Sequence, residues 1–420
     1  MPENGAGSRS DVVVIGAGLA GLLCASTLES RGFGVDLIEA SDAVGGRVRT
    51  DVIDGHRCDR GFQLLNPAYP AVRRYVDLKA LDLRTFDAGV AVSGPDGLRV
   101  VADPLRAPRF LGRTLSSGYL NPLELARLAR WAAPALGSVR RLVEADDTTL
   151  AESLDAAMVT GRLRREILDP FLTGVLADST GVTSANFTRL LLRSFLLGSP
   201  GVPAGGMTAL PEQLAAGLQA PPRLGVRAIG LREGVQGPVV RTDQGETSAR
   251  AVVIATDPSA ASGLLPIVSP RMKGLTTYWF SVRTAPTELN LLLVDGRGPG
   301  AGPVVNTAVM SHAAPSYAPE GRHLVQATIL WPNDVDEKHV REHLHRIYGV
   351  ATGDWELLVR HDITEALPHQ RPPLVHRQPL ALGNGLFVAG DHRDTASIQG
   401  ALVSGRRAAN AVSAAFRHGT

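Results

Sequence analysis

Short apolar runs and glycine-rich turns alternate in the first fifty residues of the chain. Val12–Ile15 is a continuous apolar run, which predicts a buried strand. A turn with three glycines follows it, then an apolar stretch of helical length, and then a second short apolar run, Val35–Ile38. Strand, helix and strand in this order predict a βαβ unit with a parallel sheet.

Helical periodicity dominates between residues 86 and 203, after a β-like stretch from Val90 to Val101. The segment 121–131 predicts an amphipathic helix, with Asn121 as its N-cap and Pro122 at its first helical position. Two more helices are predicted over 164–176 and 184–197. Together these segments predict a helical cap.

Strand patterns return after the cap. Strands are predicted over 223–229, 239–242, 251–256, 276–282, 289–294 and 323–330. A charged helix is predicted from Asp336 to Tyr348. The chain therefore combines a parallel α/β unit with a second unit that has both a sheet and helices.

Three glycines in the first turn have separate roles in a dinucleotide site. Gly16 allows a tight turn, Gly18 lets the backbone approach a pyrophosphate, and Gly21 lets the helix pack closely on the strand. The helix N-terminus at Leu19 and Ala20 offers N–H groups and a positive dipole end to the phosphates.

Glu39 ends the second predicted strand, about 20 residues after the glycines. Its carboxylate is placed to accept hydrogen bonds from both ribose hydroxyls, and Ala40 follows it at the same edge. A carboxylate there disfavours a 2′-phosphate, so we do not expect NADP at this site. The order of strand, glycine turn, helix and acidic residue favours a dinucleotide site over an ordinary turn.

Gly45, Gly46 and Arg47 follow six to eight residues later. The glycines permit close backbone approach, and the arginine supplies charge for a phosphate. At this point the sequence resembles the FAD-dependent flavin amine oxidase and phytoene desaturase (protoporphyrinogen oxidase-like) superfamily, in which a GGR segment after the first βαβ unit lies at FAD. A surface turn with a solvated arginine is the alternative, and Glu39 upstream weakens it.

The chain closes with a second motif of this superfamily, a strand ending in Gly390-Asp391 and a helix starting near Ser397. The resemblance implies that Asp391 binds the ribityl-phosphate part of FAD. It also implies that the helix N-terminus points at the flavin and stabilises its reduced anion. The contacts implied at this end are Gly390, Asp391, Gln399, Gly400 and Ala401.

The resemblance implies further contacts with FAD between the two ends. Gly61 and Phe62 lie in a segment that passes close to the flavin ring, and Val226 supplies backbone contacts to adenine. No cysteine occurs in the closing motif, so we expect FAD to be bound without a covalent link.

The candidate catalytic residues are His392, Gln63 and Tyr278. His392 follows Asp391 directly, where it can donate to the flavin or act on the substrate; a structural hydrogen bond is the alternative. Gln63 and Arg60 face the reacting centre or stabilise a turn. Tyr278 is a cavity candidate, although aromatic residues of strands more often pack in a core. Further candidates for the cavity wall are Trp279, Met207 and Trp331.

Composition excludes several classes of protein. The 420 residues are 44% hydrophobic, which suits two domains with sizeable cores. A net charge of +2 gives no case for nucleic acid as a partner. Cys24 and Cys58 suggest neither a disulfide framework nor a metal site. The polar first ten residues and the absence of a long apolar run predict a cytoplasmic protein without a secretion signal.

Two charged patterns have both a plain and a functional interpretation. His339, Glu342 and His343 match an H-x-x-E-H zinc pattern, but we interpret them, with His345, as a solvated helix face and expect no metal. Seven arginines lie among apolar residues of the cap: Arg106, Arg109, Arg113, Arg127, Arg130, Arg140 and Arg141. They form a solvated cap, which we favour, or a peripheral surface that draws a lipophilic substrate from lipid.

The expected function is that of an FAD-dependent oxidoreductase acting on a small-molecule substrate. Lys273 does not match the surroundings of the lysine that many amine oxidases keep near the flavin. We therefore expect a desaturase or dehydrogenase that takes a hydride from a C–H bond of a small or lipophilic organic substrate. The alternatives are an amine oxidase, a non-redox flavin-dependent isomerase or mutase, and an FAD-containing binding module. The sequence leaves the oligomeric state open.

The fold implied by the resemblance is α/β, with a Rossmann-like FAD-binding domain interleaved with an α+β substrate domain of a sheet plus a helical cap. The FAD-binding domain is expected over 1–85, 204–264 and 372–420. The substrate domain is expected over 86–203 and 265–371.

Overall fold

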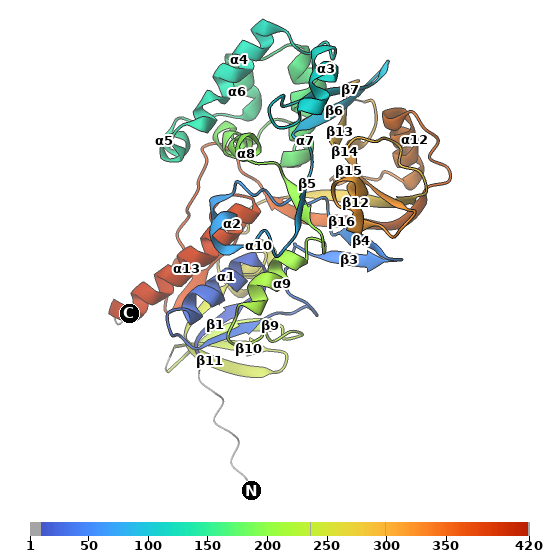
Figure 1. Ribbon diagram of the computed structural model, residues 1–420. Coiled ribbons are helices and arrows are strands. Elements are labelled where there is room, and N and C mark those ends of the chain that lie inside the picture. The colour runs from blue at the N-terminus through green and yellow to red at the C-terminus, as the bar shows by residue number, and fades with distance from the viewer. Residues whose placement is uncertain (1–9, 236, 299, 419–420) are drawn as a thin grey trace.

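The computed structural model describes residues 10–235, 237–298 and 300–418. Two seven-stranded sheets organise this part of the chain, and a group of helices caps one end of the molecule (Figure 1). The first nine residues, which belong to the segment for which we expect no secretion signal, lie outside the described residues.

The first sheet has the central order β17-β18-β11-β1-β2, with β10 and β9 added through β11. Its strands are β1 (Ser10–Ile15), β2 (Val35–Ile38), β9 (Ala228–Gly234), β10 (Gly237–Thr242), β11 (Gly245–Ile254), β17 (Ala381–Gly383) and β18 (Leu386–Val388). β1 pairs in parallel with both β2 and β11, with Val12 opposite Val35 and Ala251. The ends of β1 and β2 therefore meet at one edge, where a doubly wound sheet binds its ligand.

Two helices pack on this sheet and on each other. Every residue of α1 (Leu19–Glu29) from Leu19 to Ala25 is buried, because β1 and β2 pack against this helix together with α13 (Ile398–His418) and α9 (Ala209–Ala216). A side chain at Gly405 of α13 would bring its Cβ within 2.1 Å of the Ala20 carbonyl oxygen. The close approach of these helices needs glycine at that position, and it brings the two ends of the chain together.

The second sheet has the order β16-β12-β15-β14-β13-β6-β7. Its strands are β6 (Gly89–Gly94), β7 (Gly97–Ala102), β12 (Met272–Val282), β13 (Leu292–Asp295), β14 (Val304–Val309), β15 (His323–Trp331) and β16 (Glu356–Pro368). Side chains of β12 alternate between its two faces. Trp279 packs in the core shared with the first sheet, whereas Tyr278 and Phe280 pack in a second core under α12 (Glu337–Tyr348).

The cap and the connecting segments contain the remaining elements. The cap helices are α3 (Leu111–Leu115), α4 (Pro122–Ala132), α5 (Val139–Glu144), α6 (Leu150–Ala156), α7 (Asp169–Leu176) and α8 (Ala185–Leu197). The connecting segments contain α2 (Pro70–Tyr75), α9 (Ala209–Ala216), α10 (Pro258–Leu264), α11 (Met310–Ala313), β3 (Thr50–Ile53), β4 (His56–Asp59), β5 (Leu83–Thr85) and β8 (Gly201–Pro203). Lys273 of β12 ties the cap to the second sheet, because its Nζ donates to the Leu176 carbonyl and to the Thr183 hydroxyl.

Most predicted elements are present, and two differ. Asn121 N-caps α4 as predicted, accepting the N–H groups of Leu123 and Glu124. The strand predicted over 223–229 is wrong: β9 begins at Ala228, because Gly225 adopts a φ of +67° that breaks extended backbone. The helix predicted over 164–176 contains a π-helical turn over its first five residues, just before Pro170, which has no N–H to donate.

The strands of each sheet fall inside different predicted domains. Strands of the first sheet come from residues before 85, from 228–254 and from 381–388, and those of the second sheet come from 89–102 and 272–368. This distribution supports the two interleaved domains, whose exact boundaries stay a prediction. Within the ranges that the structure describes, no helix has both the length and the apolarity needed to cross a membrane.

Candidate functional site

The turn between β1 and α1 leaves open space at Gly18. Gly16 adopts a φ of +102°, and a Cβ at Gly21 would lie 1.9 Å from the Gly16 carbonyl oxygen. An ideal Cβ at Gly18 has no neighbour within 4 Å, and no side chain caps the N-terminus of α1 at Leu19 and Ala20. Open space in front of uncapped helical N–H groups is what a bound phosphate requires.

Glu39 lies half-buried at the end of β2, beside this turn. Its Oε2 accepts the Ala17 N–H at 2.7 Å, while Oε1 accepts the N–H and the hydroxyl of Ser41 at 2.9 and 2.5 Å. These bonds fix the orientation of the carboxylate and leave Oε2 able to accept one more donor. The N–H of Val226 donates to the Glu39 carbonyl at 2.9 Å, so the predicted ribose and adenine contacts lie together, next to the exposed Ala40.

The loop with Gly45 and Gly46 lies directly against the first turn. The Gly45 N–H donates to the Ala17 carbonyl at 2.8 Å, and a Cβ at Gly46 would lie 3.4 Å from Gly18 Cα. Gly45 has a φ of +116°, and its Cβ would lie 2.3 Å from the Val48 carbonyl oxygen. The two glycine motifs therefore form one continuous backbone surface.

Arg47 connects this surface to the other end of the chain. Its Nη2 donates to Asp391 Oδ1 at 2.6 Å, and its Nη1 donates to the Ala366 carbonyl at 2.8 Å. Burial acts against the charged guanidinium, yet the Asp391 carboxylate beside it keeps the pKa of Arg47 above its usual value. Both the first and the last sequence motif are thus brought to one place.

His392 follows on the same short turn and has no hydrogen-bond partner within the described residues on either ring nitrogen. The ring lies over Gly390, whose φ of +149° and absent Cβ accommodate it. Only 5% of His392 is exposed, and this burial lowers its pKa to about 4. The imidazole is therefore neutral at pH 7, with one donor and one acceptor available.

The start of α13 lies beside the same turn. Ser397 accepts the Ala401 N–H through its carbonyl and the Gly400 N–H through its hydroxyl. A Cβ at Gly400 would lie 1.8 Å from the Thr395 carbonyl oxygen, so the tight turn needs glycine. The side chain of Gln399 does not project toward free space, because its Oε1 accepts the Ala71 N–H at 2.8 Å and holds α2 against α13.

Gln63 has a positioning role in this arrangement. Its Nε2 donates to the carbonyl oxygens of Arg47 and Arg60 at 2.6 and 2.9 Å, so both amide hydrogens are used inside the protein. Gly61 has a φ of +91° and borders Leu275 of β12. Phe62 packs edge-to-face against Phe86, with ring centroids 6.5 Å apart. This segment therefore lies against the second sheet at Leu275, and its closeness to the flavin stays a prediction.

The structure contradicts the assignment of Tyr278 to the cavity, and it favours the second of the two interpretations of Arg60. Tyr278 does not face the nucleotide motifs: its hydroxyl donates to the Val335 carbonyl at 3.0 Å, and its ring stacks on Phe280 under α12. Arg60 does not face a reacting centre with a free guanidinium, because it binds Asp51 through two nitrogens. Strand alternation explains the error at Tyr278, since the neighbouring Trp279 occupies the inner face instead.

Three buried polar groups lie near this region: Trp279, which the sequence offered as a cavity candidate, and Thr277 and Asp59, which were missed. Thr277 and Trp279 are fully buried on the inner face of β12, and the Thr277 hydroxyl and the Trp279 indole N–H have no partner among the described residues. Asp59 is fully buried between the two sheets and accepts hydrogen bonds from Thr50, Met207 and Tyr317. Burial raises the pKa of Asp59 to about 6. The alternation of side chains along β12 could have placed Thr277 and Trp279 on the inner face. No pattern in the sequence indicates that Asp59 is buried.

The histidines of α12 do not form a metal site. His339 and His345 are exposed as predicted, but His343 is buried, which corrects its assignment to a solvated face. Its Nδ1 accepts the Val304 N–H and its Nε2 contacts Asp295 at 2.7 Å. No group of three or more potential metal-binding side chains occurs in the part of the chain that the structure describes.

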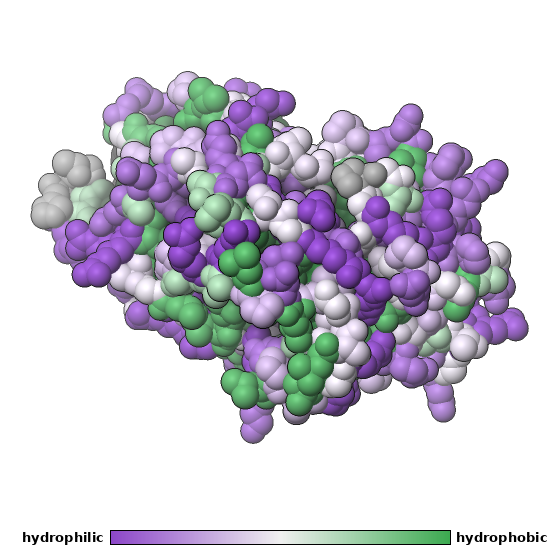
Figure 2. Space-filling view, turned by 90° about the horizontal axis from the view of Figure 1, so that it is seen from above, coloured by the Kyte–Doolittle hydropathy of each residue, from purple (hydrophilic) through white to green (hydrophobic). Residues whose placement is uncertain are grey.

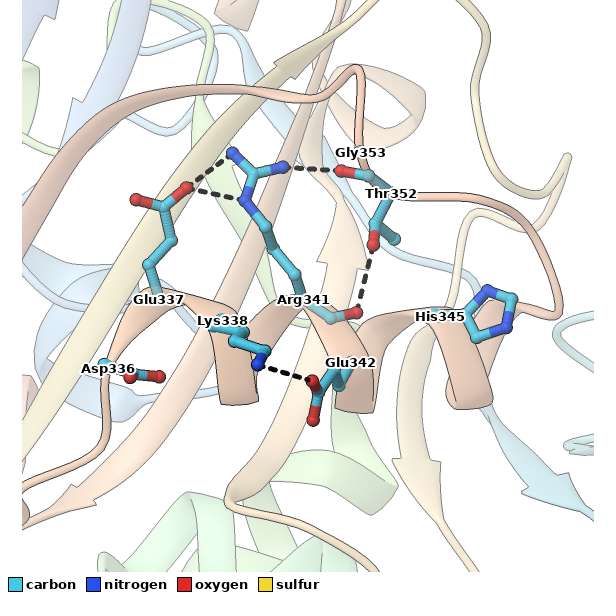
Figure 3. A pocket seen from close by; sticks show the side chains of 8 residues that line it. All are labelled: Asp336, Glu337, Lys338, Arg341, Glu342, His345, Thr352 and Gly353. Atoms are coloured by element: carbon cyan, nitrogen blue, oxygen red, sulfur yellow. Dashed lines mark hydrogen bonds and ion pairs between the residues drawn. The ribbon is translucent and has the colours of Figure 1, made fainter.

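A shallow surface hollow also borders α12 (Figure 3). Arg341 spans it from Glu337 to the Thr352 carbonyl, and Lys338 faces Glu342. Its arginine and its lysine thus pair with glutamates of the same hollow, which lies on the outer side of the second sheet. The hollow contains none of the nucleotide motifs.

The fold and the site define a two-domain protein with a dinucleotide-binding Rossmann-like domain. The family model for flavin-containing amine oxidoreductases matches residues 19–413. The chain belongs to this family, and its membership implies a flavin cofactor.

Relatives of known description are similar at moderate identity. A putative flavin-containing monoamine oxidase of Mycobacterium tuberculosis is 28% identical over 294 residues, which cover 64% of this chain and 62% of that protein. Putrescine oxidase of Kocuria rosea is 28% identical over 233 residues, 50% of this chain and 46% of that enzyme. The matched region thus spans less than two thirds of the length of each relative.

Solved structures share the fold over nearly the whole chain. A putative protoporphyrinogen oxidase from Exiguobacterium superposes with a TM-score of 0.72 at 19% identity and covers 97% of this chain and 99% of that one. Putrescine oxidase bound to putrescine superposes with a TM-score of 0.69 at 18% identity and the same coverage.

The residues present fit a flavin dinucleotide. The open space at Gly18, the glycine loop at Gly45 and the unpartnered imidazole of His392 are the observations that support the fit. The space at Gly18 and the His392 imidazole are not used by the described residues themselves, and the Gly45 loop brings a second stretch of backbone against the first turn.

Proposed function

We propose that this chain is an FAD-dependent oxidoreductase that takes a hydride from a C–H bond of a small or lipophilic organic substrate. The observation that carries the proposal is the pairing of Arg47 with Asp391, which brings the glycine motifs near the N-terminus to the closing motif near the C-terminus. When bound, FAD supplies the acceptor for the hydride.

The proposed contacts with FAD come from four segments. The first turn and Glu39 bind the pyrophosphate and ribose of the adenosine half, and Val226 lies beside the adenine. Arg47, Asp391 and the start of α13 bind the ribityl-phosphate half. The full set is Gly16, Gly18, Leu19, Ala20, Gly21, Glu39, Ala40, Gly45, Gly46, Arg47, Gly61, Phe62, Val226, Gly390, Asp391, Gln399, Gly400 and Ala401, with Gln399 acting through its backbone.

The protein's own part in the chemistry is to position the substrate and to exclude water. Gln63 holds the backbone of Arg47 and Arg60 in register, so it fixes the loops on both sides of the flavin segment. His392 is neutral at pH 7 and offers a hydrogen bond without a charge. A dry site lets such dipoles act strongly on a neighbouring charge.

Two substrate classes have support. A desaturase or dehydrogenase is favoured by Lys273, because its ammonium is buried at the cap and bonded to Leu176 and Thr183. The second candidate is an amine oxidase, which the names of the relatives from Mycobacterium tuberculosis and Kocuria rosea favour. In both cases the bond cleaved is C–H. Two buried free thiols, Cys24 and Cys58, support a cytoplasmic location.

The test starts with the visible spectrum of the purified protein. A flavin spectrum is expected, and acid precipitation is expected to release FAD into the supernatant, as for a non-covalent cofactor. Substrates are then added anaerobically, in one series of amines and one of neutral apolar compounds, and bleaching of the flavin identifies the class. A protein that binds no flavin overturns the proposal. Turnover without an electron acceptor supports an isomerase, and a flavin that dithionite cannot reduce supports a binding module.

A further inference from the structure

We propose that the helical cap binds the surface of an anionic lipid bilayer through an exposed, basic and leucine-rich segment, residues 104–143, together with the end of α8. The sequence alone favoured a solvated cap. The positions of the leucines in the structure reverse that preference. The proposal does not depend on the reaction assigned above.

Large apolar side chains are concentrated on the outside of the cap. Of the 17 exposed large hydrophobic residues found in the described chain, ten lie between Leu105 and Leu197. Leu105 is 91% exposed, Leu115 is 64% exposed, and Leu136 is 59% exposed. Helix α4 has eleven residues, of which Trp131 alone is buried. Figure 2, which looks down onto the cap, shows hydrophobic residues among hydrophilic ones on this face.

Several of these leucines belong to one continuous surface. Arg106 Nη1 donates to the Phe195 carbonyl at 3.0 Å, which places the loop of Leu105 beside the end of α8. Arg193 Nη1 donates to the carbonyls of Ala135 and Gly137, which places the turn of Leu136 beside the same helix. The end of α8 itself exposes two more leucines, at 196 and 197.

The charge of this segment is almost entirely positive. Residues 104–143 contain seven arginines and one acidic residue, Glu124. The Glu124 carboxylate is bonded to the N–H groups of Arg162 and Leu163 and so is not free to neutralise the surface. Arg106, Arg109 and Arg140 pair with carboxylates. In the described chain, four arginines of the segment form no ion pair: Arg113, Arg127, Arg130 and Arg141.

Charge complementarity selects the occupant. A second copy of the chain would set this basic surface against its own image, and like charges in contact oppose association. Nucleic acid would leave the protruding leucines in water. An anionic bilayer accepts both kinds of side chain at once, with arginines at the headgroups and leucines at the acyl boundary.

The experiment uses the full chain and sedimentation with vesicles of phosphatidylglycerol and phosphatidylcholine in equal parts. The protein is expected to sediment with these vesicles at low salt, at least tenfold more tightly than with pure phosphatidylcholine, and less at high salt. The triple variant Leu105→Ser, Leu136→Ser, Leu196→Ser and the triple variant Arg113→Glu, Arg130→Glu, Arg141→Glu are each expected to bind at least tenfold more weakly.

Matched variants elsewhere on the surface control for general effects. The double variant Val235→Ser, Val268→Ser removes apolar side chains that are as exposed as the leucines but lie outside the cap. The triple variant Arg74→Glu, Arg241→Glu, Arg283→Glu changes the net charge by the same amount as the cap arginine variant, at exposed positions outside the cap. Both are expected to bind as the wild type does, and circular dichroism confirms that all variants are folded. The proposal is overturned if the wild type does not sediment with anionic vesicles, or if the cap variants bind like the controls. It is also overturned if light scattering shows a dimer that the cap variants dissociate, since a second copy would then be the occupant.

Discussion

Arg47 and Asp391 are separated by 344 residues in the chain and by 2.6 Å in space, from Nη2 to Oδ1. The pair lies where the glycine loop after β2 meets the turn before α13. One third of the Arg47 side chain is exposed, whereas Asp391 is almost fully buried. The guanidinium therefore has a buried partner on one side and an accessible side for a second anion.

Replacing Arg47 tests this second role. Arg47→Ala is expected to weaken FAD binding roughly 10- to 100-fold, because a hydrogen bond to a charged group contributes about 1.5–3 kcal/mol. Flavin titration followed by fluorescence measures the change. Arg49→Ala is the control, because Arg49 lies only two residues after Arg47 but pairs with the exposed Asp42. Equal effects of the two substitutions would contradict the assignment.

The glycines of the first turn are expected to separate folding from binding. A Cβ at Gly21 meets the Gly16 carbonyl at 1.9 Å, so Gly21→Ala is expected to lower the free energy of unfolding by about 1–3 kcal/mol or more. Gly18→Ala meets nothing in the protein and is expected to change stability by less than about 0.5 kcal/mol. Its added methyl group is nevertheless expected to weaken FAD binding at least tenfold. Urea unfolding of the apoprotein and flavin titration measure the two effects. Normal binding by Gly18→Ala would place the pyrophosphate elsewhere.

Asp59 is expected to make the protein less stable as the pH rises from about 4 to about 6. Burial raises the pKa of its folded-state carboxyl to about 6, from an unfolded value near 3.8. The folded protein therefore binds the proton more tightly, and this contribution is complete below the unfolded pKa and lost as the pH passes the folded pKa. The loss amounts to at most about 3 kcal/mol. Because other carboxyl groups change in the opposite direction, the test is the difference between the wild type and Asp59→Asn over this range. A difference that does not vary with pH would contradict it.

His392 is expected to make the protein more stable as the pH rises, which is the opposite of the effect of Asp59. Its folded pKa of about 4 lies below the ordinary value of 6.5, chiefly because the ring is buried. Its contribution to stability is present above pH 6.5 and is lost as the pH falls toward 4, by about 3 kcal/mol at most. His392→Asn is expected to flatten this part of the stability profile, and His345→Asn, at an exposed position, is expected to leave it unchanged. NMR titration of the imidazole is an independent check.

Tyr278 is expected to matter for stability alone. Tyr278→Phe removes the hydrogen bond to the Val335 carbonyl and is expected to cost about 1 kcal/mol. The flavin spectrum and the rate of flavin reduction by an accepted substrate are expected to stay at wild-type values. A reduction rate that falls tenfold or more would return Tyr278 to the site.

The cofactor motifs were the part that sequence reasoning could place. Gly16 and Gly45 each adopt a positive φ and Gly18 leaves open space, as their spacing predicts, and the strand before each motif places it at one edge of the sheet. The long-range partners followed no such rule. No sequence pattern predicts that Gln399 accepts a hydrogen bond from α2 or that Gln63 donates one to the Arg47 carbonyl. None predicts that Asp59 is buried. Tyr278 and Trp279 are neighbours on β12 and point to opposite faces of the sheet. Which of them faces the first sheet depends on the packing of the two sheets, which the sequence does not show.

Helix α13 also determines when α1 can be fully covered. Helix α1 is apolar on every side, and the partner that covers one of those sides, α13, begins only at Ile398. During synthesis the second sheet and the cap can assemble while that side of α1 remains uncovered. A nascent or truncated chain that ends just before Gly390 therefore contains every strand of the first sheet but leaves apolar residues of α1 exposed, and it lacks both Asp391 and α13. We therefore expect a molecule that retains the flavin to contain α13.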